Sequence, residues 1–448
     1  MGDTNEGAGS WRSSVTTAIG SSFAGLFRRK RQQQPIHDGS IRDDDDDIAI
    51  MDERIRKDFC EIEDTFGSLA WEQCVDSDLP EERRLVRVED YPSNKCQTMN
   101  TRQHVWAEIK RVRDEQSCLG HADLYRRKWS EHHDTVADFS VLQFNTLAEG
   151  LSSGNTATPP FLPSNPKESA DYGGFSSVPN PETVFDFNQR KWRLLEVILG
   201  GDGENEQAST PYDILSLEEV DRFHGFFAPM LRLFGYRGIF VPKTNSPSAR
   251  NGWYSDGCCL FWKDKEFELV TAQRCKYAVG TQVYLVVTLR HSRTQELLII
   301  GSTHLKAQRS NANEAVRCAQ VSELLGSVKR EKTEHGENAS ILVLGDFNAD
   351  PPQQVEGTES AIGRMGGSLT SAYNLDDKSF YTSAKIRGNK MSKRAIDYIF
   401  FDEGSLQCAG TLGVPKEDHL EPSKLPGLRF PSDHLHIAAK FQFGNDSS

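Results

Sequence analysis

The chain has 448 residues, of which 37% are hydrophobic and 26% are charged. This composition suits a water-soluble globular protein and excludes a membrane channel, a coiled-coil rod and a collagen-like fibre. The 65 acidic and 52 basic residues give a net charge of -13 at pH 7, which argues against a protein that coats nucleic acid through bulk positive charge. No apolar run reaches the roughly 18 residues of a transmembrane helix, so we expect no membrane insertion.

The N-terminal region carries two contrasting segments. Residues 11–34 contain Ser, Thr, apolar and Arg residues but no acid, as in a mitochondrial transit peptide. A disordered tail with a basic tip fits the same segment, and residues 28–31 (RRKR) would also suit a nuclear signal. The five aspartates at 43–47 repel one another and mark a boundary. We therefore expect residues 1–135 to be largely disordered or weakly helical, in a cytoplasmic protein with mitochondrial targeting as an alternative.

From residue 136 onward, short apolar runs closed by polar residues predict buried strands. Helical patterns lie between them at 189–199, 223–234 and 312–328. Because the strands are apolar on both faces, we expect an α/β fold with a two-layer β-sandwich core flanked by helices, formed by residues 136–448. The Gly, Ser and Pro-rich stretch 150–184 predicts a long surface loop. The predicted strands are 139–145, 213–220, 238–243, 258–262, 284–290, 297–305, 341–348, 395–401 and 436–443.

Polar residues stand at the ends of several of these runs. Each alone is weak evidence, because strands lead into polar loops in any protein. Together they supply carboxylates for a hard divalent cation, a carboxylate to activate water, and amides and imidazoles for phosphate oxygens. No G-x-S-x-G nucleophile motif is present, so metal-assisted hydrolysis of a phosphate is favoured over covalent acyl transfer. The residues are Asn145, Glu219, His304, Asp346, Asn348 and Asp397.

Seven short motifs follow one another in a characteristic order along the chain. They are NTLA (145–148), LEEVD (217–221), DGC (256–258), THLKA (303–307), GDFNADP (345–351), IDYI (396–399) and PSDHL (431–435). This series resembles that of the endonuclease/exonuclease/phosphatase superfamily, in its deadenylase-related branch. Seven motifs in the same order are far more specific than any single one. The resemblance implies the α/β sandwich fold and a metal-dependent phosphoester hydrolase.

The resemblance also implies roles for the residues on the metal and water side of the site. Glu219 would be the principal ligand of Mg²⁺, or of Mn²⁺, and Asn145 would lie beside it. Asp346 would position the attacking water and accept its proton. Asn348 would hold a non-bridging phosphate oxygen.

Two histidines would act on the phosphate. His434 lies beside Asp433 in the sequence, and Asp397 is supplied from a separate segment. A carboxylate bonded to an imidazole fixes its tautomer and keeps it protonated. His304 would contact the phosphate from the opposite side, and Asp256 would orient neighbouring polar groups.

The substrate implied by the resemblance is a phosphorylated dinucleotide. The branch includes enzymes that remove the 2'-phosphate of NADP⁺ and NADPH, which gives NAD⁺ and NADH, and we expect a monomeric phosphatase of this kind. Lys243 and Lys306 match positions that face substrate phosphates. Arg309 is shifted by one residue from the usual position, because Gln308 follows the HLKA motif. Lys243 ends a predicted strand and shows no structural role in the sequence, so we expect its removal to leave stability nearly unchanged.

Two other functions stay open. A 3'-5' poly(A) exoribonuclease would act on RNA and needs a basic channel with stacking aromatic residues. The acidic balance and the absence of a clustered basic and aromatic segment argue against it. A scaffold that has lost catalysis is the other alternative, but it would have no physical need to keep Glu219, Asp346, Asn348 and His434.

Overall fold

A computed structural model describes nine stretches of the chain. The predicted targeting segment, the aspartate run and most of the expected N-terminal region lie outside the described residues. Within the stretches described, no helix combines the length and the apolar character that crossing a membrane requires. The stretches are 102–131, 136–152, 172–175, 177–200, 211–243, 246–250, 253–336, 338–351 and 360–444.

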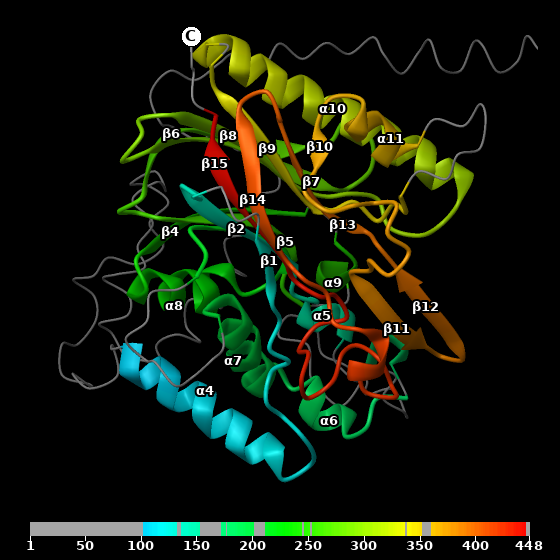
Figure 1. The fold of residues 1–448 in the computed structure, drawn as a ribbon. Coiled ribbons are helices and arrows are strands. Elements are labelled where there is room, and N and C mark those ends of the chain that lie inside the picture. The colour runs from blue at the N-terminus through cyan, green and yellow to red at the C-terminus, as the bar shows by residue number, and fades with distance from the viewer. Residues whose placement is uncertain are drawn as a thin grey trace, which may run out of the picture. The chain divides into compact units, whose positions relative to one another are not determined.

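Two mixed β-sheets form the core of the fold (Figure 1). The described strands are β1 (Trp129–Glu131), β2 (Phe139–Asn145), β3 (Ile214–Val220), β4 (Tyr236–Pro242), β5 (Gly257–Lys263), β6 (Phe267–Lys276), β7 (Val283–His291), β8 (Leu297–His304), β9 (Ser340–Asp346), β10 (Thr370–Ser371), β11 (Ser383–Arg387), β12 (Lys390–Arg394), β13 (Asp397–Phe401), β14 (Leu406–Leu412) and β15 (Ile437–Phe443). The larger sheet has the order β1-β14-β15-β2-β3-β5-β4, and the smaller has the order β10-β13-β9-β8-β7-β6. Strands β11 and β12 form a separate hairpin.

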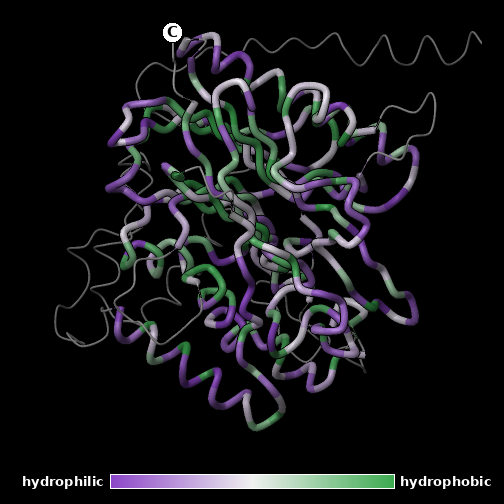
Figure 2. The backbone as a smooth tube through the Cα atoms, viewed as in Figure 1, coloured by the Kyte–Doolittle hydropathy of each residue, from purple (hydrophilic) through white to green (hydrophobic). Residues whose placement is uncertain are grey.

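The two sheets pack face to face through buried apolar side chains. Val141 and Ile214 of the larger sheet share one cluster with Leu285 and Ile300 of the smaller sheet. The next residue along β2, Leu142, faces the outside of the sandwich and belongs to a different cluster, because successive side chains of a strand point to opposite faces. Figure 2 shows that hydrophobic residues are concentrated along these central strands. The strands are therefore apolar on both faces, as the sequence predicts.

Helices cover the outer faces of both sheets (Figure 1). The described helices are α4 (Arg102–Ser117), α5 (Glu149–Ser152), α6 (Pro181–Val184), α7 (Phe187–Ile198), α8 (Ala228–Leu233), α9 (Pro247–Arg250), α10 (Asn311–His335) and α11 (Ala361–Gly366), with short η segments at Tyr172–Gly174, Phe223–Phe227 and Glu417–His419. α4, α7 and α8 pack against the larger sheet, and α10 and α11 against the smaller one. The predicted α/β sandwich with flanking helices is confirmed.

Side-chain caps define where the main helices begin. Asp186 accepts a hydrogen bond from the backbone N–H of Asn188 at the start of α7. Ser310 does the same for Asn313 at the start of α10. Such caps satisfy backbone donors that a helix start leaves free, and they are worth about 1 kcal/mol each.

Two elements precede the expected domain start at residue 136. Arg113 of α4 donates a hydrogen bond from Nη1 to Glu196 Oε1 of α7 at 2.9 Å. Strand β1 pairs antiparallel with β14, with Trp129 opposite Leu412. Residues 102–131 therefore pack with the sandwich. The expected loop at 150–184 also differs, because its described residues include the end of α5 and all of α6.

Candidate active site

The candidate active site lies where strands of both sheets end together. In the larger sheet, β2 and β3 run parallel and place Asn145 opposite Glu218. In the smaller sheet, β8 and β9 run parallel and place His304 opposite Asp346. Strand β13 begins at Asp397, which is also paired with Asp346. Parallel strands end at the same edge of a sheet, so residues far apart in the sequence meet there.

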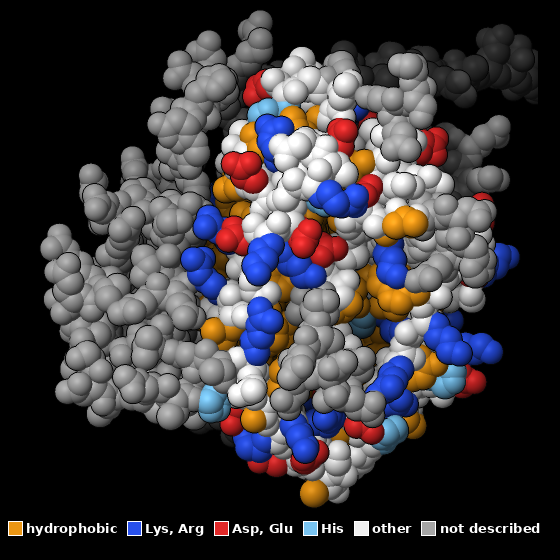
Figure 3. All heavy atoms as spheres, turned by 60° about the vertical axis from the view of Figure 1, so that its left-hand side comes forward, with side chains coloured by type: hydrophobic (Ala, Val, Ile, Leu, Met, Phe, Trp, Pro, Cys, Tyr) orange, Lys and Arg blue, Asp and Glu red, His pale blue; other side chains and the backbone are white. Residues whose placement is uncertain are grey.

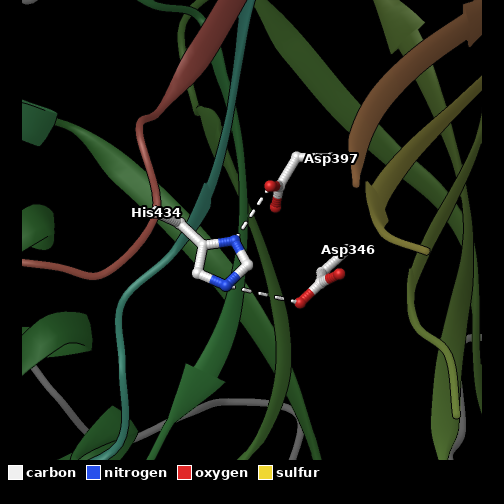
Figure 4. A group of neighbouring side chains, drawn as sticks. All are labelled: Asp346, Asp397 and His434. Carbon is white, nitrogen blue, oxygen red and sulfur yellow. Dashed lines mark hydrogen bonds and ion pairs between the residues drawn. The ribbon is translucent and has the colours of Figure 1, made fainter. Parts of the chain in front are cut away.

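His434 lies between two buried carboxylates (Figure 4). Its Nδ1 atom is 2.8 Å from Asp397 Oδ2, and its Nε2 atom is 3.9 Å from Asp346 Oδ2. The carboxylate can only accept, so Nδ1 carries a hydrogen. Burial disfavours the imidazolium, but the charges of Asp397, Asp433 and Asp346 outweigh it and raise the pKa of His434 to about 9. His434 is therefore a cation at neutral pH.

Asp346 is placed to act as a base. Its Oδ2 accepts a hydrogen bond from Asn145 Nδ2 at 3.0 Å, and its Oδ1 accepts one from the backbone N–H of Asn348 at 2.8 Å. Burial and the neighbouring charge of Asp397 raise the pKa of Asp346 to about 6, although His434 opposes the shift. At pH 7 the carboxylate is ionised and is basic enough to accept a proton from water.

Lys243 is part of a buried polar chain. Its ammonium donates to Asp256 Oδ2 at 2.6 Å and to His304 Nδ1 at 3.0 Å. Because an ammonium has no acceptor, Nδ1 of His304 has no hydrogen and Nε2 carries it, 3.6 Å from Asp346 Oδ2. Burial and the charge of Lys243 hold the pKa of His304 well below its usual value, so this imidazole is neutral.

The expectation that Lys243 has no structural role is wrong. Only 7% of the residue is exposed, and its partner Asp256 is fully buried. The lysine compensates a carboxylate that would otherwise be an unpaired charge in the protein interior. The same contact holds His304 in one tautomer, so Lys243 supports the site as well as bordering it.

Asp433 faces the β11–β12 hairpin more closely than it faces His434. Its Oδ2 accepts hydrogen bonds from Lys385 and from Arg387, the latter at 3.4 Å, whereas its Oδ1 is 4.0 Å from His434 Nε2. Burial opposes ionisation, but Lys385, His434 and Arg387 together hold the pKa of Asp433 below its ordinary range. The sequence did not indicate Lys385 and Arg387 as site residues. A sequence feature that could have pointed to them is that residues 383–394 contain basic but no acidic side chains.

Three expected phosphate contacts lie in the loops after β8 and β9. Asn348 donates from Nδ2 to Leu305 O at 3.2 Å, and its backbone has a φ of 50°. Lys306 is partly buried in the same region. Arg309 is 66% exposed and pairs with Asp350 at 3.2 Å, so the structure does not join it to the buried cluster.

The two adjacent glutamates of β3 have different environments. Glu219 lies at a bulge with a φ of 55°, is partly exposed, and accepts a hydrogen bond from the backbone N–H of Ala148 at 3.2 Å. Glu218 is fully buried and accepts hydrogen bonds from Gln143 Nε2 at 2.7 Å and Ser216 Oγ at 2.8 Å. Gln143, which the sequence did not indicate, also donates to Asp397 Oδ1 at 3.0 Å.

The carboxylates of the candidate site could bind a divalent metal. In the described part of the chain, Asp346, Asp397 and His434 form the one group of three metal-binding residues whose ligand atoms lie within 4.8 Å of one another. His434 already bonds Asp397 through Nδ1, and its raised pKa disfavours the neutral imidazole that a metal needs. Glu219 is partly exposed, and a carboxylate oxygen is a ligand that suits Mg²⁺. The metal ligand expected from the sequence, Glu219, is not a member of this group of three.

Comparisons with known proteins agree with this geometry. Residues 186–434 match the model of the Endonuclease/Exonuclease/phosphatase family. The chain is 30% identical to nocturnin of Xenopus laevis over 342 residues, which cover 73% of this chain and 78% of that protein. The solved catalytic domain of human nocturnin with bound sulfate has a TM-score of 0.50 and 26% identity, and covers 71% of this chain and 98% of that one. A more distant relative is the 3'-5'-exoribonuclease subunit Ccr4 of Debaryomyces hansenii, with 26% identity over 72% of this chain and 41% of that protein.

The family model spans more than half of the chain, and its range contains most of the strand-end residues described above. The chain therefore belongs to the endonuclease/exonuclease/phosphatase family of hydrolases. Within that family it is a nocturnin-like protein.

Proposed function

We propose that the chain is a Mg²⁺-dependent phosphatase that removes the 2'-phosphate of NADP⁺ and NADPH and leaves NAD⁺ and NADH. The observation that carries the proposal is the pairing of a base, Asp346, with a buried imidazolium, His434, 3.9 Å from it. Such a pair suits the attack of water on a phosphate, in which one group must accept a proton and another must offset negative charge.

The reaction follows from these positions. Asp346 holds the attacking water through Oδ2, the oxygen that also accepts a hydrogen bond from Asn145, and it accepts the proton of this water. His434, fixed by Asp397, donates a charged N–H from Nε2 to a phosphate oxygen. Neutral His304 offers its Nε2 hydrogen from the other side. When bound, a divalent metal at Glu219 and Asn145 would lower the charge on the phosphate.

Two basic groups separated in the sequence suit a dinucleotide that carries phosphates at two places. Lys243 and Lys306 belong to loops after strands β4 and β8, whereas Lys385 and Arg387 lie on the hairpin strand β11. The 2'-phosphate at the reacting position and the diphosphate elsewhere on the same dinucleotide could each contact a Lys or Arg side chain. The resemblance to nocturnin supports the same substrate.

The second candidate is a 3'-5' poly(A) exoribonuclease, which the similarity to Ccr4 favours. A long RNA needs a continuous basic surface with stacking residues. On the face drawn in Figure 3, Lys and Arg side chains lie among Asp and Glu side chains instead of forming one basic tract. The net charge of -13 points the same way.

One assay separates the two candidates. Purified protein with Mg²⁺ is incubated with NADP⁺, with NADPH or with oligo(A) RNA, and the released phosphate and AMP are measured. We expect phosphate from the dinucleotides and no shortening of the RNA, and no product from Asp346→Asn. Release of AMP from oligo(A) without phosphate from NADPH would replace the phosphatase with the exoribonuclease.

The compartment is a separate proposal. We propose a cytoplasmic protein with a mitochondrial fraction, because residues 11–34 are basic and free of acids. A fluorescent protein fused behind residues 1–48 should enter mitochondria, and replacing Arg28, Arg29 and Arg31 with Glu should prevent it. A diffuse signal from the unmodified fusion would argue against targeting.

A further inference from the structure

A cavity of about 320 Å³ lies on the outer face of the larger sheet, and His434 of the candidate active site forms part of its lining. Phe144 of β2 forms part of its wall. The neighbours of Phe144 in the strand, Gln143 and Asn145, point to the opposite face and into the active site. The remaining walls come from residues 124–127 and 129, from Val197 and Gly200 at the end of α7, from residues 211–212 before β3, from Leu412 of β14, and from residues 429–431 and 434–436. The cavity and the active site thus lie on opposite faces of the same sheet, and the loop that carries His434 borders both.

Arg127 brings a positive charge to this cavity without a matching acid. Its guanidinium donates from Nε to Gly413 O at 2.6 Å, from Nη1 to His436 O, and from Nη2 to Leu412 O at 3.3 Å. No carboxylate among the described residues pairs with it. Burial lowers the pKa of Arg127, yet a guanidinium stays charged in proteins. Two of its five N–H groups make none of these bonds, and a charge held only by carbonyls favours an anion.

The other polar groups of the wall are also donors. None of the lining residues is acidic, and three of them are arginines: Arg126, Arg127 and Arg429. Within the described stretches, the Tyr212 hydroxyl donates no hydrogen bond. Burial raises the pKa of this tyrosine to about 12, so the hydroxyl keeps its hydrogen. The imidazole of His436 is neutral, because burial and the charge of Arg127 hold its pKa well below the usual value, and it can donate one N–H.

Aromatic rings form much of the remaining surface. Tyr125, Trp129, Phe144, Tyr212 and Phe430 all line the cavity. Trp129 and Tyr212 lie with ring centroids 6.5 Å apart, and the Arg429 guanidinium lies over the Tyr125 ring at 5.3 Å. Rings and donors together suit a flat ligand that carries negative charge, and the volume lies in the range of small-molecule sites.

We propose that this cavity binds an aromatic phosphate of mononucleotide size, on the face of the larger sheet opposite the active site. The phosphate bonds the free N–H groups of Arg127 and the hydroxyl of Tyr212, and the ring lies among the aromatic side chains.

The position of the cavity makes it a regulatory site. His434, Leu435 and His436 form one wall, and Arg127 bonds the carbonyl of His436 two residues beyond the catalytic imidazole. A phosphate that attracts Arg127 competes with this carbonyl and changes the support of the loop. Occupancy should therefore alter turnover at saturating substrate, where competition in the active site no longer matters.

The binding test uses the full chain in excess chelator, so that it depends on no activity. Calorimetric titrations with 5'-AMP, adenosine and inorganic phosphate are run on the unmodified protein and three variants. Tyr212→Phe removes one hydroxyl and should weaken AMP binding about three- to tenfold, and Arg127→Gln should weaken it by more than ~10-fold. Arg387→Gln, which alters the active site, should leave AMP binding unchanged. Thermal unfolding checks that Arg127→Gln folds, and Tyr212→Phe carries the test if it does not.

The other results would each contradict one part of the proposal: the location of the site, the aromatic ligand or the regulatory role. AMP binding that Arg387→Gln weakens and Tyr212→Phe does not would place the nucleotide in the active site, and the absence of saturable AMP binding would remove the proposed site altogether. Inorganic phosphate that binds as tightly as AMP would overturn the aromatic part. For the regulatory part, AMP should change kcat of the unmodified enzyme and not of Tyr212→Phe, and an unchanged kcat would overturn it.

Discussion

Nδ1 of His434 lies 2.8 Å from Oδ2 of Asp397, and at least 95% of each residue is buried. Three carboxylates surround the imidazole and overcome the effect of burial, so the pKa of His434 is raised from 6.5 to about 9. The imidazolium is thus a fixed feature of the site across the neutral range.

The first prediction concerns pH. A raised pKa means that the ion pair stabilises the fold fully below about 6.5 and that this contribution disappears as the pH rises through about 9. Turnover that needs the charged imidazole should fall over the same alkaline range. Asp397→Asn removes the largest of the attractions that hold the proton and should move the alkaline limb of kcat/KM to lower pH. An alkaline limb that stays in place in this variant would assign it to another group.

The second prediction concerns the catalytic pair. Asp346→Ala and His434→Ala should each lower kcat at least ~10²-fold, the scale of losing a group that transfers a proton or stabilises charge in the transition state. KM should change less, because both groups act mainly on the transition state. Steady-state kinetics on NADPH measure both constants. A large rise in KM with unchanged kcat would reassign the residues to substrate binding.

The third prediction separates Glu218 from Glu219. Glu219→Ala should lose nearly all turnover and weaken the Mg²⁺ dependence of the remainder, and excess chelator should stop the unmodified enzyme. Burial raises the pKa of Glu218 well above its usual value, so this carboxyl ionises less readily than an ordinary glutamate. Glu218→Gln keeps its shape and can accept from Gln143 while donating to Ser216, so activity should be largely retained. If Glu218→Gln abolishes metal dependence and Glu219→Ala does not, the two roles are exchanged.

The fourth prediction concerns Lys243. Its replacement by Ala leaves Asp256 as an unpaired buried charge, which should cost about 3 to 5 kcal/mol in the free energy of unfolding. Urea denaturation measures this loss. The double variant Lys243→Met with Asp256→Asn removes both charges and should recover much of the stability but not the activity. A Lys243→Ala protein as stable as the unmodified one would show that the pair contributes nothing to the fold.

The central strands could be predicted closely because their signal is local. The run 139–145 forms β2 with the same bounds, since every residue in it is buried. Strand β6 was missed, because only its first residue is fully buried and polar residues interrupt the apolar pattern. The hairpin β11–β12 was missed for the same reason. Predicted strand 341–348 runs two residues too far, since β9 ends at Asp346.

The sequence could predict which residues belong to the site and their order along the chain, but not their contacts in space. Asn145, His304 and Asp346 stand at the ends of apolar runs, and the structure brings them together. The burial of Lys243 and the approach of Lys385 to Asp433 depend on pairing between distant segments, which no local pattern contains.

The three residues of β1 protect the edge of the larger sheet. They occupy the outer side of β14, which would otherwise present a row of free backbone N–H and C=O groups. A chain trimmed to begin at residue 136 would lose this cover together with the ion pair between Arg113 and Glu196. Its open edge would be a template for strands of other molecules, so the trimmed protein should self-associate even while its catalytic residues stay in place.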